Sequence, residues 1–251
     1  MELLGQGAAE LGVELSTDQL ERFETYYLEL ADWNQRVNLT AITGRHRVQV
    51  QHFLDSLTVI LAISGGPPSA MRLVDVGTGA GFPGLPLKLA FPWIRLTLVE
   101  SVGKKARFLE HIVKLLGLSD VEILTGRAEH LAHQANLRES FDLAVSRGVA
   151  RMSTLLEYTL PFCCVGGRVA LLKRGIEAEL AGAVHALETL GGRRGETYPV
   201  EVSGLNDGRV VVAVVKVGPT PDQYPRRPGM PAKRPLYRAK LRKEQKNRGW
   251  L

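Results

Sequence analysis

The stretch VDVGTGAGFPG, residues 74–84, places four glycines within eight residues directly after an apolar run. Because glycine has no Cβ atom, Gly77, Gly79 and Gly81 permit positive φ angles and a close approach of the backbone to a ligand. In open α/β sheets, ligands bind beyond the carboxyl ends of the strands. The stretch therefore predicts a strand that ends in a ligand-binding turn.

The rest of the chain shows the alternation of strand-like and helix-like segments that is typical of an α/β fold. Apolar runs alternate with helix-like segments and cover residues 72–77, 95–100, 121–126, 141–148 and 167–174. Strands that alternate with helices of this length predict a parallel sheet. Only SGLNDG separates the last two runs, residues 196–202 and 209–217, so we expect them to form an antiparallel hairpin. Five βα units and a terminal hairpin favour the class I methyltransferase fold, which is Rossmann-like with a mostly parallel seven-stranded sheet.

The first 65 residues are expected to form an N-terminal helical cap. Ser16 and Gln19 match a capping box, and a second helix is expected from about residue 45 to 63. The apolar stripe of the first helix consists of Leu20, Phe23, Tyr27 and Leu30. GGPPS, residues 65–69, breaks the helix, so we divide the chain into residues 1–65, a ligand-binding domain at 70–218 and a tail at 219–251.

Charge is distributed unevenly along the 251 residues. The tail at 219–251 holds ten Lys or Arg against two acidic residues, whereas the whole chain has a net charge of only +6. This basic, proline-rich segment either binds a polyanion or forms a solvated, disordered tail, and charge alone leaves both open. We expect no membrane span and a cytoplasmic location, and the adjacent Cys163 and Cys164 are interpreted as packing residues in a reducing compartment.

Two ligands compete for the glycine loop. The spacing from Gly79 to Gly84 fits a dinucleotide fingerprint, whereas Asp75 followed by Gly77 fits the pattern for S-adenosylmethionine (SAM). The register favours SAM because the first glycine directly follows the strand, and because Pro83 removes an N–H group that a phosphate would need. Glu100 ends the second strand and is placed to accept hydrogen bonds from a ribose, which both ligands carry.

The third and fourth strands narrow the chemistry. Arg127, Ala128 and Glu129 follow the third strand, where class I methyltransferases place the adenine-contacting segment. Arg147 ends the fourth strand, where it could bind the SAM carboxylate, a phosphate or guanine O6, or form an ordinary surface salt bridge. The chain has neither the Asn/Asp-Pro-Pro-aromatic loop of adenine amino methylation nor a cysteine placed for attack on a pyrimidine. Guanine N7 needs no general base, so alignment and electrostatics suffice there.

The combined motifs resemble the bacterial RsmG (GidB) family. The matching segments are DVGTGAGFPGLPLKLAFP (75–92), VESVGKKARFLEHIVKLLGL (99–118), FDLAVSRGVA (141–150), LLKRG (171–175), NLTAIT (38–43), HFLDSL (52–57) and YPRRPGMPAKRPL (224–236). The chain departs from the family in having Gly148 where alanine is usual. The extension at 237–251 lies beyond the family's common end.

The resemblance implies SAM-dependent methylation of N7 of the guanine at position 527 of 16S ribosomal RNA, by a monomer without a metal. The implied partner is this RNA, in the small ribosomal subunit or in an assembly intermediate. The cofactor-binding residues would be Asp75, Gly77, Gly79, Phe82, Glu100, Ser101, Val102, Ala128, Glu129 and Arg147, with Arg147 also facing the RNA. Further RNA-binding residues would be Lys173, Arg226, Arg227, Lys233 and Arg234.

Two other functions stay open from the sequence. An NAD(P)-dependent oxidoreductase could use the same glycine loop, and a non-catalytic RNA-binding or assembly factor could keep a SAM pocket. His130 and His133 could share a helix face, but no third ligand stands near them, so we expect no metal site there. His52 and Asp55 are interpreted as an interdomain hydrogen bond.

Overall fold

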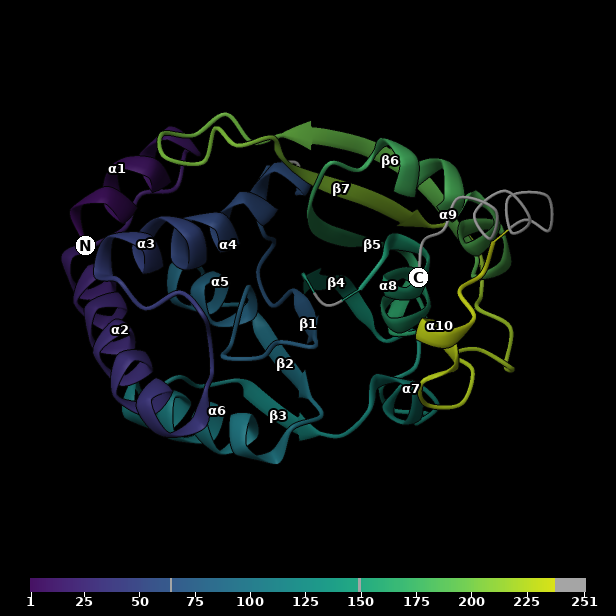
Figure 1. Ribbon diagram of the computed structural model, residues 1–251, viewed down its shortest axis with the longest axis horizontal. Coiled ribbons are helices and arrows are strands. Elements are labelled where there is room, and N and C mark those ends of the chain that lie inside the picture. Colours follow the sequence, from purple (N-terminus) through teal and green to yellow (C-terminus); the bar gives the residue numbers. More distant parts are fainter. Residues whose placement is uncertain (64, 149, 238–251) are drawn as a thin grey trace.

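A computed structural model describes residues 1–63, 65–148 and 150–237. A twisted central sheet runs through this part of the chain (Figure 1). Its strands are β1 (Arg72–Val76), β2 (Arg95–Glu100), β3 (Val121–Thr125), β4 (Phe141–Arg147), β5 (Cys163–Arg174), β6 (Gly192–Pro199) and β7 (Arg209–Lys216). The order is β3-β2-β1-β4-β5-β7-β6, with β7 antiparallel to both β5 and β6 and the other pairs parallel. The predicted sheet and its terminal hairpin are confirmed.

Helices cover both faces of the sheet. One face packs against α1 (Glu2–Glu10), α2 (Thr17–Val37), α3 (Arg45–Val48), α4 (Asp55–Leu57), α5 (Gly84–Ala90) and α6 (Gly103–Leu115). The other packs against α7 (Ala128–Leu131), α8 (Met152–Thr159) and α9 (Glu177–Thr189), and α10 (Met230–Lys233) lies on α8. Successive residues of a strand point to opposite faces, so Leu143 and Val145 of β4 join the first core while Ala144 joins the second.

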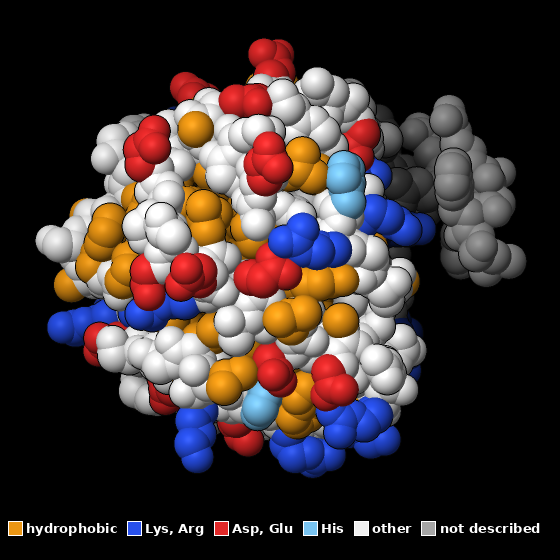
Figure 2. All heavy atoms as spheres, turned by 90° about the vertical axis from the view of Figure 1, so that its left-hand side faces the viewer, with side chains coloured by type: hydrophobic (Ala, Val, Ile, Leu, Met, Phe, Trp, Pro, Cys, Tyr) orange, Lys and Arg blue, Asp and Glu red, His pale blue; other side chains and the backbone are white. Residues whose placement is uncertain are grey.

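The N-terminal helices share one continuous core with the sheet rather than forming a core of their own. The capping box is confirmed, because the Ser16 hydroxyl accepts from the Gln19 amide and the Gln19 side chain accepts from the Ser16 amide. The apolar stripe is confirmed: Phe23 and Leu30 are buried, and the partly exposed Leu20 and Tyr27 pack against the same core. It omitted Tyr26, which is fully buried. Figure 2 views this side of the molecule and shows acidic and basic side chains interspersed with apolar ones.

The second predicted helix is a composite. A π-helical turn (Gln49–Leu54) joins α3 to α4, and a 3-10 turn (Thr58–Ala62) follows. A π-helical turn changes the direction in which the following side chains point, and such turns are frequent at functional sites. This one contains His52 and directly precedes Asp55, and both residues contact the sheet as described below.

Residues 219–237 pack against α7 and α8 (Figure 1). Arg226 forms two side-chain hydrogen bonds, of 2.8 and 2.6 Å, with the fully buried Glu157. The Thr154 hydroxyl donates to the Pro231 carbonyl at 3.1 Å. Residues 219–237 of the predicted tail are therefore packed as part of the fold. The remaining residues of the tail, 238–251, lie outside the described residues. Among the described helices, none is long and apolar enough to cross a membrane.

Candidate functional site

The loop between β1 and α5 forms the first half of the site. Gly77, Gly79 and Gly81 have φ angles of 74°, 61° and 99°, a region that side chains other than glycine rarely adopt. The amides of Gly77 and Thr78 donate to the Val99 carbonyl at 2.9 and 3.2 Å, which ties the loop to β2. A Cβ atom on Gly79 would meet no heavy atom within 4 Å, so the loop is open on that side.

Asp75 lies beneath this loop with one oxygen satisfied and the other not. Its Oδ2 atom accepts from the Thr78 hydroxyl at 2.7 Å and from the Gly84 amide at 2.8 Å. Its Oδ1 atom has no hydrogen-bond partner in the described structure. Burial raises the pKa of this carboxyl to about 6. A buried polar atom without a partner is costly, so the Oδ1 atom of Asp75 is an unsatisfied acceptor directly beneath the glycine loop.

Glu100 fixes the opposite side of the loop. Its carboxylate accepts from the Gly79 amide at 2.9 Å and from the Val102 amide at 2.7 Å. These bonds hold the carboxylate in place, and each oxygen keeps a further lone pair for a ribose hydroxyl. Ser101 and Val102 are both exposed beside it, and an exposed Val102 side chain fits the face of an adenine ring.

The predicted adenine segment after β3 is only partly available. Ala128 is half-buried at the start of α7. Glu129 is 2% exposed, and one oxygen of its carboxylate accepts from Arg127 and from the Gly229 amide, both at 2.9 Å. The Glu129 side chain therefore anchors residues 219–237, which the sequence did not predict, and its place beside a cofactor stays a prediction.

Arg147 ends β4 and is held by the N-terminal helices, so the interpretation of a surface salt bridge is wrong. Its side chain is 17% exposed and forms an ion pair of 3.0 Å with Asp55. It also donates to Nδ1 of His52 at 2.9 Å, and its guanidinium lies 4.9 Å from the ring centroid of Phe82. Because His52 also stacks on Phe82 at 4.4 Å, this group connects the N-terminal helices to the glycine loop.

His52 is neutral in this arrangement. Burial, and then the positive charge of Arg147, lowers the pKa of its imidazole to about 3. Since Nδ1 accepts from Arg147, Nε2 carries the proton and donates to the Thr40 hydroxyl at 2.8 Å. We expected His52 and Asp55 to supply an interdomain hydrogen bond, and both side chains hydrogen-bond to Arg147 at the end of β4.

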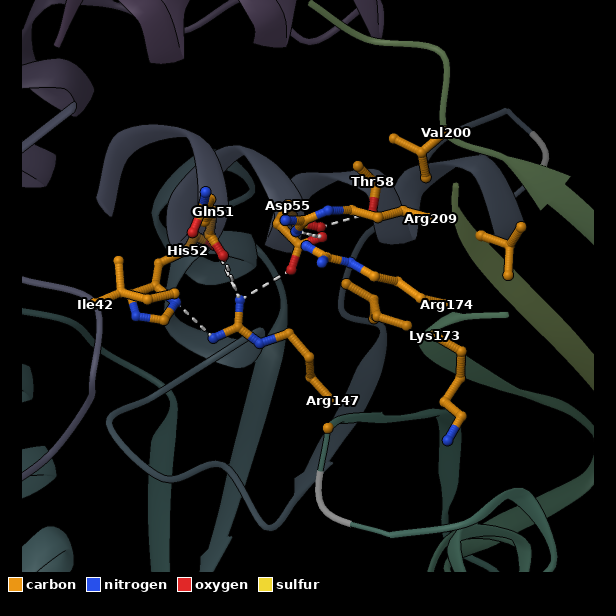
Figure 3. A pocket seen from close by; sticks show the side chains of 13 residues that line it. Ile42, Gln51, His52, Asp55, Thr58, Arg147, Lys173, Arg174, Val200 and Arg209 are labelled. Carbon is orange, nitrogen blue, oxygen red and sulfur yellow. Dashed lines mark hydrogen bonds and ion pairs between the residues drawn. The ribbon is translucent and has the colours of Figure 1, made fainter. Parts of the chain in front are cut away.

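Charges of alternating sign surround a cavity at this edge of the sheet (Figure 3). Asp55 accepts from Arg147 and also from Arg209, the latter at 2.6 Å. Arg209 in turn pairs with Asp207, which pairs with Arg174 at 2.7 Å. The cavity has a volume of about 390 Å³ and adjoins the glycine loop through Arg147. It is large enough to take a nucleobase.

The predicted RNA-binding cations differ in availability. Lys173 points away from the Asp55 cluster (Figure 3), donates to the Ala150 carbonyl at 3.0 Å and pairs with Glu179 at 2.8 Å. Arg226 is bound to the buried Glu157, so its guanidinium is used within the fold. Exposed cations in the same part of the chain are Arg227, Lys233 and Arg234.

Neither Arg209 nor Asp55 was predicted from the sequence to be a residue of the functional site. One signal was present: an antiparallel last strand must begin at the edge where the parallel strands end. Arg209 is the first residue of β7 and pairs with Arg174, the last residue of β5. The expected hairpin could therefore have placed Arg209 beside the ligand.

The cysteines and histidines set aside earlier have structural contacts. Cys163 and Cys164 are the first two residues of β5. Cys163 is fully buried, and burial raises the pKa of its thiol to about 12. This thiol therefore stays protonated and does not supply a nucleophile. His133 forms a 2.8 Å hydrogen bond with the Pro225 carbonyl.

Comparison with known proteins gives a consistent result. A family model named GidB, described as rRNA small subunit methyltransferase G, matches residues 19–199. A ribosomal RNA small subunit methyltransferase G of Dehalococcoides mccartyi is 52% identical over 237 residues, which cover 94% of this chain and all of the relative. The protein of the same name from Roseiflexus castenholzii is 48% identical and covers 91% of this chain and 97% of its own length.

Solved structures share the fold at low identity. A mutant of MtNAS in complex with S-adenosylmethionine has a TM-score of 0.53 at 19% identity, covering 86% of this chain and 77% of its own. A SAM dependent methyltransferase from Aquifex aeolicus has a TM-score of 0.50 at 18% identity, covering 69% and 94%. These likenesses concern the architecture of the sheet and its helices.

Proposed function

The chain belongs to the GidB family of rRNA small subunit methyltransferases G, and on that premise we propose that it methylates N7 of the guanine at position 527 of 16S rRNA. Family membership makes it a SAM-dependent methyltransferase of 16S rRNA guanine, so it is neither an oxidoreductase nor a non-catalytic factor. The methylated atom, the position in the RNA and the residues that act are the proposal. One observation carries it: the charged side chains around the cavity are engaged in ion pairs and hydrogen bonds, so none of those described is free to act as a general base.

The cavity beside Arg147 offers no strong base among its described residues. Asp55 is paired with two guanidinium groups, and His52 has a pKa of about 3. An acceptor that must lose a proton during methylation needs a better base than either. Guanine N7 has a lone pair and no proton, so it requires only alignment with the methyl group and a suitable electrostatic field.

The residues of the glycine loop fit SAM. The free Oδ1 atom of Asp75 would accept from the ammonium group, and Gly77, Gly79 and Phe82 would surround the methionine part. Glu100 would accept from the ribose hydroxyls while Ser101, Val102, Ala128 and Glu129 would line the adenine pocket. SAM supplies the methyl group, which is transferred in line to the acceptor nitrogen.

Arg147 would act through the field at the acceptor. Methylation of N7 makes the guanine cationic, so an uncompensated guanidinium beside it would oppose the reaction. The ion pair of Arg147 with Asp55 offsets this charge. Arg147 would therefore lie between the cofactor and the acceptor base, and its charge, offset by Asp55, would not repel the cationic product.

Binding of the RNA would use exposed cations of residues 219–237 together with cations that line the cavity. Arg227, Lys233 and Arg234 are exposed on residues 219–237, and phosphate contacts of this kind supply much of the affinity for RNA. Arg147 and Lys173 would approach the RNA at the cavity itself, while Arg226 acts as an anchor to Glu157. We propose that the protein acts as a monomer in the cytoplasm, on the small ribosomal subunit or its assembly intermediate.

Two measurements test the proposal. Isothermal titration should give SAM binding and no comparable NAD binding. Tritiated methyl groups from SAM should enter 16S rRNA from a strain that lacks the modification, and should not enter RNA in which the guanine at position 527 is replaced. Binding of NAD in place of SAM, or equal labelling of the replaced RNA, would overturn the proposal.

A further inference from the structure

Helix α2 contacts both ends of α5 through side chains. At its N-terminus, the Gln19 side chain donates to the carbonyls of Leu89 and Ala90, at 2.8 and 3.0 Å. Two turns later, the Tyr26 hydroxyl donates to the Ala80 carbonyl. Ala80 lies within the glycine loop, so an N-terminal helix directly fixes the backbone that the proposed function assigns to SAM.

Tyr26 contacts three successive residues of the loop. Besides its bond to Ala80, its ring stacks on Phe82 with a centroid distance of 5.5 Å and an interplanar angle of 19°. A Cβ atom on Gly81 would lie 2.5 Å from the Tyr26 oxygen. Such a distance is a steric clash, so the residue between Ala80 and Phe82 must be small for Tyr26 to reach its partner.

The glycines of the loop therefore have two different roles. Gly79 faces open space, with no heavy atom within 4 Å of its missing Cβ atom. Gly81 faces Tyr26 and Leu85. A ligand would approach on the open side at Gly79, whereas Tyr26 supports the loop from the buried side, which is where a positioning group belongs.

The Tyr26 hydroxyl is a permanent donor. The side chain is fully buried, and burial raises the pKa of its phenol well above the ordinary value. It therefore stays protonated at neutral pH. Ala80 is buried with it, and the Tyr26 hydroxyl is the side-chain donor that its carbonyl meets among the described residues.

We propose that Tyr26 is a positioning residue for the cofactor: its hydroxyl holds the Ala80 carbonyl so that the glycine loop is preorganised for SAM. The inference rests on the proposed function, because that function assigns the loop to SAM. A preorganised loop loses less freedom on binding, so loss of this bond weakens SAM binding without touching the RNA site.

The test is Tyr26→Phe, which removes the hydroxyl and keeps the ring contacts. We expect the Kd for SAM to rise about tenfold, since a buried acceptor loses its partner. The KM for SAM should rise similarly, with kcat and the KM for RNA within about twofold of the wild-type values. These readouts separate positioning of the cofactor from a purely structural role.

Two matched variants control the experiment. Tyr27→Phe removes the same hydroxyl from the neighbouring, half-buried residue and should change neither the Kd nor the Tm. Gln19→Leu loosens α2 at the far end of α5 and should lower the Tm while leaving the Kd for SAM within about twofold.

A lower Tm for Tyr26→Phe with an unchanged Kd would overturn the inference, as would equal weakening of SAM binding by Gln19→Leu. Both results presuppose that the wild-type protein binds SAM. A wild-type protein that does not bind SAM would instead overturn the proposed function, so the two failures are distinguishable.

Discussion

Replacing Asp55 with asparagine removes the carboxylate that Arg147 and Arg209 share. The three side chains are 8%, 17% and 8% exposed respectively. Removing one partner from a buried ion pair costs about 3 to 5 kcal/mol. In the variant, Arg147 still hydrogen-bonds to His52 and Arg209 still pairs with Asp207. We therefore expect a loss at the lower end of this range, about 3 kcal/mol of unfolding free energy.

For a chain of this size, about 3 kcal/mol corresponds to a decrease in Tm of roughly 6 to 12 °C. The variant should also methylate more slowly, since the guanidinium of Arg147 would then face, without its counter-charge, a product that becomes cationic. Urea denaturation at pH 7 measures the first effect, and single-turnover methylation of unmodified 16S rRNA measures the second.

Asp207→Asn is the matched control. Asp207 also pairs with Arg209, but its side chain is 41% exposed, so its removal should cost at most about 1 kcal/mol. If Asp55→Asn and Asp207→Asn lowered stability equally, or if Asp55→Asn left the rate of methylation unchanged, the account of the charge network would be refuted.

Four further predictions concern the pKa of Asp75, the residues at 219–237 and the basic end of the chain. The pKa of Asp75 is raised to about 6, so the folded state binds its proton more tightly than the unfolded state does. The free energy of unfolding of the wild type should therefore fall as the pH rises from about 4 to 6. Urea midpoints measure this trend, which should be absent in Asp75→Asn. SAM affinity should fall about tenfold from pH 7 to 5 as Asp75 is protonated, and calorimetry on Asp75→Asn should show no such dependence. Arg226→Ala should cost about 3 to 5 kcal/mol because Glu157 is left buried without its partner, whereas Arg227→Ala should weaken RNA binding with no change in Tm. Deletion of residues 238–251, which carry six Lys or Arg, should reduce the slope of log affinity for RNA against log salt by up to about 4 without changing the Kd for SAM; an unchanged slope would exclude this segment from RNA binding.

The sequence predicted the features that depend on local pattern. The apolar runs gave the strands to within a few residues, and the short SGLNDG connection correctly predicted the antiparallel hairpin of β6 and β7. Ser16 and Gln19 correctly marked the start of α2. Each of these rests on neighbouring residues, whose spacing a single sequence displays directly.

Features that depend on contacts between distant segments were not predictable in the same way. Tyr26 was missed although it is fully buried, because the helical spacing of Phe23, Tyr27 and Leu30 already completes an apolar stripe without it. Asp55 and Arg209 lie far apart in the sequence and meet only through the sheet order. The basic composition of residues 219–237 gave no sign that Arg226 would be used by the buried Glu157.

The account's central claim is methyl transfer to guanine N7 without a general base. Nucleoside analysis by mass spectrometry, after reaction of the purified protein with SAM and unmodified 16S rRNA, tests this claim most directly. The account predicts 7-methylguanosine, formed in single turnovers at a rate that does not increase between pH 7 and 9. Methylation at N1 or N2 of guanine, or a rate that rises with the deprotonation of a side chain in that range, would contradict it.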